Sequence, residues 1–131
     1  MIFVETSAIL SVLVTNDVNH ERAIQRWHNL LEENQIMLTN NYVLVESTVI
    51  IQKRLGLTKV RDFQENILPF LTTEWLDETQ HNIALQHVLA ANRRQLSLVD
   101  YSCFETMRRM NIEKVFTFDS HFREQGFEII P

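Results

Sequence analysis

Short apolar runs that alternate with longer stretches of helical spacing constrain the fold of this 131-residue chain more than any other feature of its sequence. Runs rich in β-branched and aromatic residues predict strands at 1–5, 36–38, 72–76, 115–118 and 127–130. The intervals between them are long enough for the helical crossovers that parallel strands require. We therefore predict a three-layer α/β/α fold with a central parallel sheet of four to five strands, and the whole chain as a single domain.

Helical spacing of apolar residues fills every interval between these runs. The predicted helices are 8–14, 19–33, 41–55, 58–68, 77–94 and 97–110, with a short helical turn at 120–125. Thr6 or Ser7 is expected to cap the first helix, residues 39–41 the third, and Gly56 is expected to end the third. The apolar side of the fifth helix is expected to consist of Ile83, Leu85, Val88 and Leu89.

Composition excludes several classes of protein. Two glycines and two prolines argue against disorder and against an all-β fold rich in tight turns. Cys103 is the only cysteine, which excludes an internal disulfide and a cysteine-based zinc cluster and favours a reducing cytoplasm. The apolar start of the chain is interrupted by Glu5 and has no basic segment before it, so we expect neither a signal peptide nor a membrane span.

The net charge of −5 argues at first sight against a nucleic-acid partner, because such proteins are usually basic. Acids gathered around divalent cations would, however, be largely neutralised in the working protein. Basic residues also fall in three adjacent pairs, at 53–54, 93–94 and 108–109. Such a pair can contact phosphates, although a solvated helix face is the commoner role of any single pair.

Four acids stand at positions that the sequence pattern makes unusual. Glu5 ends the first predicted strand and Asp119 the fourth, and ligands gather outside the carboxyl ends of parallel strands. Glu46 and Asp100 each lie within the apolar stripe of a predicted helix, where an unpaired carboxylate is energetically costly. Acids from four segments of the chain therefore become candidates for one site.

Each acid also has a purely structural explanation. Glu5 can end a strand and face water, and Glu46 can reach solvent from the edge of its stripe. Asp100 fits a capping box with Ser97, and Asp119 can cap the turn after it. Taken singly, the structural explanation is favoured for the two aspartates and balanced for the two glutamates. Taken together, the four favour a metal site, since without cations they would repel one another and their pKa values would rise.

Four sequence blocks resemble the PIN-domain family in their order and spacing: FVETSAIL, NYVLVES, SLVDYSCFETMRR and FTFDSHF. The resemblance covers essentially the whole chain and is nearest to the single-domain VapC-type toxins of type II toxin–antitoxin systems. It implies a metal-dependent endoribonuclease in which Glu5, Glu46, Asp100 and Asp119 hold Mg²⁺ or Mn²⁺, the hard cations that carboxylates suit. It also implies products with 5′-phosphate and 3′-hydroxyl ends, a homodimer, and a cognate antitoxin that covers the groove and often places a basic side chain among the acids.

One position departs from the family's pattern, which usually has Asp where this chain has Glu5. The added methylene moves the carboxylate by roughly 1 Å or more, and catalytic placement is sensitive to such shifts. Glu5 is consistent with a natural variant, with a weakened enzyme, or with a substitution made so that a toxic protein could be produced. The resemblance places Thr6 near the site. Tyr42 and His121 are further substrate-binding candidates, with a core and a surface position as their simpler explanations.

Two other functions stay open at this stage. A catalytically silent PIN fold would only bind RNA or a protein partner, and Glu5 is the feature that favours it. A metal-dependent nuclease acting on DNA flaps or single strands is the second. The short chain lacks the long insertions that such DNA nucleases usually carry, which lowers the weight of this alternative.

Overall fold

The computed structural model describes all residues from Met1 to Pro131 and contains a five-stranded sheet in which every neighbouring pair is parallel. The strands are β1 (Ile2–Val4), β2 (Met37–Asn40), β3 (Leu71–Glu74), β4 (Lys114–Phe116) and β5 (Glu128–Ile129). Their order in the sheet is β3-β2-β1-β4-β5, so β1 is central. Strands β1 and β2 are buried along their whole length, because helices cover both faces of the sheet.

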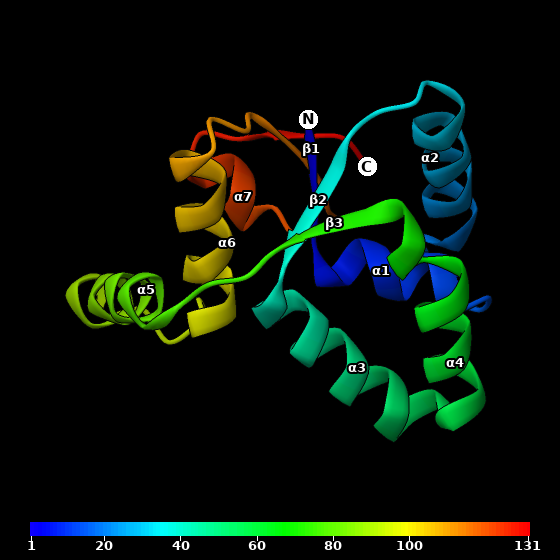
Figure 1. Ribbon diagram of the computed structural model, residues 1–131, viewed down its shortest axis with the longest axis horizontal. Helices are drawn as coiled ribbons and strands as arrows, with labels where there is room; N and C mark the ends of the chain where they lie inside the picture. The colour runs from blue at the N-terminus through cyan, green and yellow to red at the C-terminus, as the bar shows by residue number, and fades with distance from the viewer.

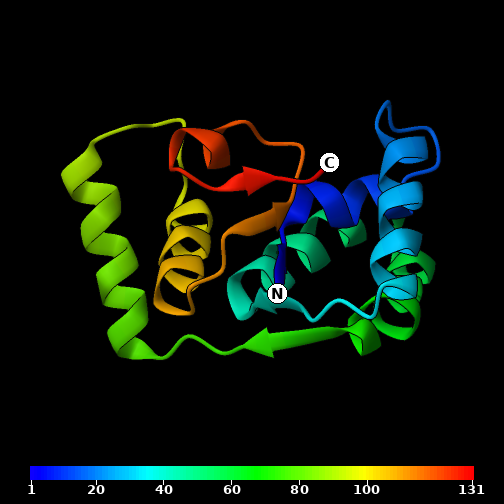
Figure 2. The same cartoon turned by 90° about the horizontal axis from the view of Figure 1, so that it is seen from above.

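Helices lie on both sides of this sheet, which confirms the predicted three-layer α/β/α fold. They are α1 (Thr6–Leu13), α2 (His20–Glu32), α3 (Asn41–Leu55), α4 (Leu57–Asn66), α5 (Glu78–Ala91), α6 (Leu98–Arg109) and α7 (His121–Glu124), with a 3-10 turn η1 (Leu68–Phe70). Helices α1, α2 and α4 lie on one side, and α6 and α7 on the other with α5 outside α6 (Figure 1; Figure 2). Helix α3 leaves the end of β2 and packs against both α1 and α6.

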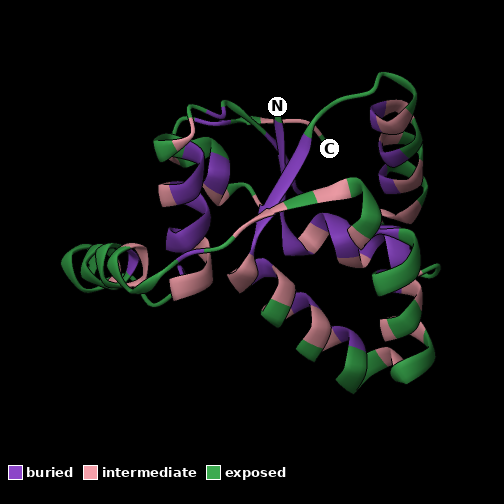
Figure 3. Ribbon diagram, in the orientation of Figure 1, coloured by how far each residue is buried: buried purple, intermediate pink, exposed green.

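The core contains β1, β2 and β4 and the inner faces of α1 and α6, and buried side chains of α2, α3 and α4 extend it (Figure 3). Phe104 of α6 stands edge-on to Phe122 of α7, with the ring centroids 5.0 Å apart, and it stacks on Phe127 at 6.0 Å. Burying a side chain of this kind contributes roughly 1.5–3 kcal/mol. These rings therefore hold the segment after β4, which carries Asp119, firmly against α6.

The start of α3 is tied to α6 by the buried side chain of Asn40. Its Oδ1 accepts a hydrogen bond from Val43 N at 2.9 Å, which caps α3 as predicted for this segment. Its Nδ2 donates to Ser102 Oγ and to Thr106 Oγ1, both at 3.2 Å. The amide side chain of Asn40 thus caps α3 and also links the start of α3 to α6.

Two other helix ends test the sequence predictions. Gly56 ends α3 as predicted, and its φ of +89° lies in the region that favours glycine because other residues meet their own Cβ there. The predicted cap of the first helix was wrong. Glu5, and not Thr6 or Ser7, is the N-cap of α1, since its side chain accepts a hydrogen bond from Ser7 N.

Helix α5 is the most exposed helix of the fold (Figure 3). Ala84 is its only buried residue, whereas Ile83 and Leu85 are each 38% exposed and Leu89 is 71% exposed. The predicted apolar side of this helix was therefore wrong for these three residues, because only the narrow face around Ala84 and Val88 meets α6. No helix, α5 included, is long and apolar enough to cross a membrane.

Candidate active site

Glu5 follows β1 directly, and its carboxyl group is buried at the carboxyl edge of the sheet. One oxygen, Oε2, accepts hydrogen bonds from Ser7 N at 3.0 Å, from Ser7 Oγ at 2.6 Å and from Thr117 Oγ1 at 2.6 Å. Burial raises the pKa of Glu5 to about 7 against the opposing effect of these hydrogen bonds, and Asp119 raises it further. The group is therefore fixed in place where its negative charge is poorly compensated.

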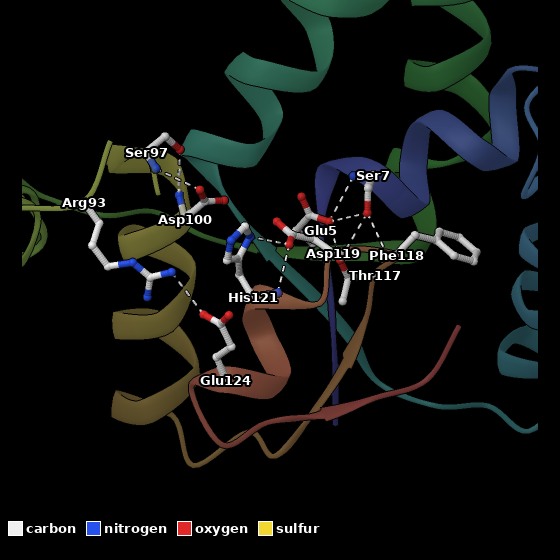
Figure 4. A network of polar contacts seen from close by, with 10 residues as sticks. All are labelled: Glu5, Ser7, Arg93, Ser97, Asp100, Thr117, Phe118, Asp119, His121 and Glu124. Atoms are coloured by element: carbon white, nitrogen blue, oxygen red, sulfur yellow. Dashed lines mark hydrogen bonds and ion pairs between the residues drawn. The ribbon is translucent and has the colours of Figure 1, made fainter. Parts of the chain in front are cut away.

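Two hydroxyl residues, Ser7 and Thr117, build this environment (Figure 4). Besides contacting Glu5, Ser7 Oγ accepts a hydrogen bond from Phe118 N at 2.9 Å, and Thr117 Oγ1 accepts one from Asp119 N at 3.0 Å. Together they join the end of β1 to the end of β4. From the sequence, Ser7 was predicted only as a possible helix cap, and Thr117 was not predicted as a site residue. The sequence feature that could have identified both is a hydroxyl residue two positions from a strand-end acid: Ser7 follows Glu5, and Thr117 precedes Asp119.

Asp119 lies just after β4 with 29% of its side chain exposed. Its Oδ1 accepts a hydrogen bond from His121 N at 2.9 Å and contacts His121 Nδ1 at 2.7 Å. The side chain thus orders the turn that follows, as its structural explanation required. It also lies close enough to Glu5 and Asp100 to raise the pKa of both carboxyl groups.

Asp100 lies in the first turn of α6 and forms the predicted capping box with Ser97. Ser97 N donates to Asp100 Oδ2 at 2.8 Å, and Asp100 N donates to Ser97 Oγ at 3.1 Å. Partial burial raises the pKa of Asp100, and Asp119 raises it further, whereas Ser97 and His121 lower it. Figure 4 shows His121 between Asp100 and Asp119. The residue therefore caps a helix and faces the strand-end acids at the same time.

Glu46 on α3 is half-buried and makes no hydrogen bond or ion pair within the chain. It lines a groove of about 570 Å³ together with Asn41, Tyr42, Val45, Val49, Ile50 and Val99. Val45 is 64% exposed and Val49 is 48% exposed. The apolar stripe around Glu46 therefore faces this groove and not the core, which corrects the prediction of an inward-facing stripe.

The buried thiol of Cys103 shows how near the acids are to one another. Burial raises the pKa of Cys103 well above its usual value, and the charges of Glu5, Asp100 and Glu46 raise it further. Glu5 at the end of β1, Asp100 on α6 and Glu46 on α3 thus all lie near enough to this thiol to influence it. No three His, Cys, Asp or Glu side chains stand close enough to hold a single cation as they are placed. Their oxygen donors nevertheless fit Mg²⁺ or Mn²⁺ in chemical type.

The three substrate-binding candidates occupy different surroundings. Thr6 is buried beside Glu5, and its Oγ1 has no hydrogen-bond partner. Tyr42 lines the groove next to Glu46, and its hydroxyl contacts His81 Nδ1 of α5. His121 has 30% of its side chain exposed beside Asp119. Tyr42 and His121 are therefore open to a ligand, and Thr6 is enclosed.

A comparison with known families and proteins agrees with this geometry. The PIN domain profile matches residues 2–128, and the chain therefore belongs to the PIN-domain family. It is similar to the 23S rRNA-specific endonuclease VapC20 from two strains of Mycobacterium tuberculosis, CDC 1551 / Oshkosh and H37Rv. Each is 26% identical over 133 residues, which cover 100% of this chain and 99% of the relative.

Solved structures give the same result. The crystal structure of Mycobacterium tuberculosis VapC20, described as a sarcin-ricin loop cleaving toxin, has a TM-score of 0.86 at 25% identity over 97% of this chain and 96% of that chain. FitAcB from Neisseria gonorrhoeae has a TM-score of 0.72 at 16% identity, covering 100% of this chain and 97% of that one, and shares the fold. The predicted membership of the PIN-domain family and the predicted resemblance to VapC-type toxins are thus confirmed.

Proposed function

We propose that this protein cuts RNA with one or two Mg²⁺ or Mn²⁺ ions held by Glu5, Glu46, Asp100 and Asp119. The observation that carries the proposal is the gathering of strand-end and helix acids around one edge of the sheet, where burial and Asp119 raise the pKa of Glu5 to about 7. A buried carboxyl group in this state gains a strong partner when a cation replaces its proton.

The bound ions would lower the pKa of a coordinated water and stabilise the charge on the phosphate. The chain's own residues hold the ligands in position. Ser7 and Thr117 fix Glu5, while Ser97 fixes Asp100. Asp119 is held through Oδ1 by the backbone that follows it. Glu46 has no hydrogen bond or ion pair within the chain that would hold it away from a cation.

The proposed substrate is RNA, and 23S rRNA is the first RNA to test. Two relatives that carry this specificity in their names match the chain over its whole length, which supports the choice. Tyr42 is proposed to contact the substrate from the groove beside Glu46, and His121 from its place between two acids. Thr6 is proposed to support the site from beneath Glu5. The products would carry 5′-phosphate and 3′-hydroxyl ends.

The proposed protein partners are a second copy of the chain and a cognate antitoxin. Val45 and Val49 on α3 are exposed apolar side chains that line one groove, and an exposed apolar patch is typical of protein interfaces. The free thiol of Cys103 fits the proposed cytoplasmic location. Light scattering of the protein alone, and after coexpression with a small neighbouring reading frame, tests both partners. A monomer in each sample would contradict both.

A single-turnover cleavage assay tests the activity itself. The substrates are an end-labelled 23S rRNA fragment, an unrelated RNA and a DNA of the same sequence, each with Mg²⁺, Mn²⁺ or EDTA. We expect metal-dependent cleavage of RNA that is lost in Asp119→Asn and retained in Asp62→Asn, a control on α4, which carries none of the four acids. Cleavage of DNA alone would indicate a DNA nuclease. Binding of RNA without cleavage would indicate a silent PIN module.

A further inference from the structure

Arg22, in the first turn of α2, carries a guanidinium group that the proposed reaction does not use. Its Cζ lies over the ring of Phe118, 5.3 Å from the ring centroid. Its Nη2 donates a hydrogen bond to Asn19 Oδ1 at 3.1 Å. No carboxylate pairs with it among the ion pairs of the structure. An aromatic face and one amide therefore hold this cation in place while most of its N–H groups stay free.

Phe118 links this cation to the acid cluster. It stands between Thr117 and Asp119, and its backbone N–H donates to Ser7 Oγ, the hydroxyl that in turn donates to Glu5. Figure 4 shows the ring of Phe118 directed away from the acids, on the opposite side of Asp119 from His121. The segment that positions the strand-end acids therefore also positions the aromatic ring that Arg22 contacts.

Arg22 also lines a polar groove of about 380 Å³ along α2. Its lining residues are Glu21, Arg22, Gln25, Arg26, Asn29 and Pro131. Arg26 stands one helical turn from Arg22 and donates from Nε to the backbone oxygen of Pro131 at 3.0 Å. It too has no carboxylate side chain as a partner. Two guanidinium groups thus share one groove with a single acid, Glu21, in a chain whose net charge is −5.

We propose that Arg22 and Arg26 form a phosphate-binding subsite that holds the RNA backbone on one side of the cleaved bond. The inference rests on the proposed cleavage of RNA. A guanidinium group binds phosphate through two parallel N–H donors, and such contacts position a nucleic acid without reading its sequence. An acidic site repels a polyanion, so a fixed cation at its rim has an evident use in bringing the substrate to it. A polar groove also suits a phosphate backbone better than an apolar protein segment.

Fluorescence anisotropy with a labelled single-stranded RNA tests the subsite, using the cleavage-deficient Asp119→Asn protein as the common background. We expect Arg22→Gln to weaken RNA binding by about tenfold and to lower the slope of log Kd against log salt by about one. Arg26→Gln should change both in the same direction and by less, because the Pro131 oxygen already occupies its Nε. The matched control is Arg61→Gln on α4, an exposed arginine without an ion pair, which should change neither.

Thermal melts of all variants separate a loss of binding from a loss of fold. Wild-type affinity and salt slope in Arg22→Gln and in Arg26→Gln would overturn the subsite, even if the otherwise native protein cuts RNA as proposed. If the unmutated protein neither binds nor cuts RNA, the proposed function fails and the subsite fails with it. Weaker binding of the antitoxin by Arg22→Gln, with unchanged binding of RNA, would assign the groove to an acidic protein segment and would also overturn the proposal.

Discussion

The acids at the strand ends and the acids on the helices are held in different ways. Glu5 and Asp119 follow neighbouring parallel strands whose register places Val4 opposite Phe116, so the sheet itself brings these two acids together. Glu46 depends on the packing of α3 and has no hydrogen-bond partner of its own. Asp100 is held by its own helix cap and meets the others only because α6 packs against α3 and the sheet.

This contrast shows which part of the proposed metal site is held in place by the chain itself. The strand-end half is fixed by hydrogen bonds from Ser7 and Thr117, and it bears the electrostatic cost of a buried carboxyl group. The helix half is more open and contributes charge from outside the sheet. We therefore expect changes to strand-end acids to alter stability and pH dependence as well as cleavage, and changes to helix acids to alter mainly cleavage.

The largest effect is expected for a helix acid, Asp100→Asn. An asparagine can still accept the hydrogen bond from Ser97 N, so the cap and the fold should persist. Loss of one metal ligand should slow single-turnover cleavage by about 10³-fold or more, which corresponds to roughly 4 kcal/mol of transition-state stabilisation. The rate is compared with that of Asp62→Asn, and circular dichroism checks the fold. Cleavage at the unmutated rate would show that Asp100 is only a cap.

The next largest effect is expected in the pH dependence of folding stability, and it comes from the strand-end acid Glu5. Because folding raises the pKa of Glu5 from 4.5 to about 7, its contribution to the stability of the metal-free protein is fully present below 4.5 and is lost as pH rises through 7. The loss amounts to on the order of 3 kcal/mol. Urea unfolding in EDTA at acidic and at mildly alkaline pH should show this fall in the unmutated protein. Glu5→Gln should lack it, and parallel pH profiles for the two proteins would contradict the expected burial of charge.

A somewhat smaller effect is expected from metal ions. Saturating Mn²⁺ binds only the folded state and should stabilise it by about 2–3 kcal/mol at concentrations near 100 times Kd, which raises the melting temperature by roughly 10 °C relative to EDTA. Glu5→Gln should remove most of this rise. Glu65→Gln, an exposed glutamate on α4, should retain it. Equal melting temperatures of the unmutated protein in Mn²⁺ and in EDTA would argue against a shared acidic site.

The smallest effect is expected for Glu5→Asp. A shorter side chain can still cap α1 through Ser7 N, and it returns the first carboxylate to the position that the family's usual Asp occupies. Mg²⁺ tolerates misplaced ligands poorly, so Mg²⁺-dependent cleavage should rise by about tenfold, or ~1.4 kcal/mol. The measurement is the single-turnover cleavage rate of Glu5→Asp and of the unmutated protein at equal Mg²⁺. A lower rate would show that the hydrogen bonds of Thr117 and Ser7 have fitted the site to glutamate.

The sequence predicted the architecture because strands buried on both faces give continuous apolar runs, as in residues 1–5 and 115–118. It singled out the four acids because each ends such a run or lies within the apolar stripe of a predicted helix. It could not predict the roles of Ser7 and Thr117, because their bonds to Glu5 depend on the pairing of two strands far apart in the chain. The contact between Arg22 and the ring of Phe118 could not be predicted either, because it depends on where α2 packs.

Direct measurement of Mn²⁺ binding by calorimetry shows whether acids from two strand ends and two helices form one metal site. The proteins to compare are the unmutated chain, Glu5→Gln, Glu46→Gln, Asp100→Asn and Asp119→Asn, with Glu65→Gln and Asp62→Asn as controls. We predict that each of the four variants weakens binding by about tenfold or more, or ~1.4 kcal/mol, and that neither control does. Unchanged affinity in Glu46→Gln and Asp100→Asn would show that the helix acids do not belong to the site of the strand-end acids.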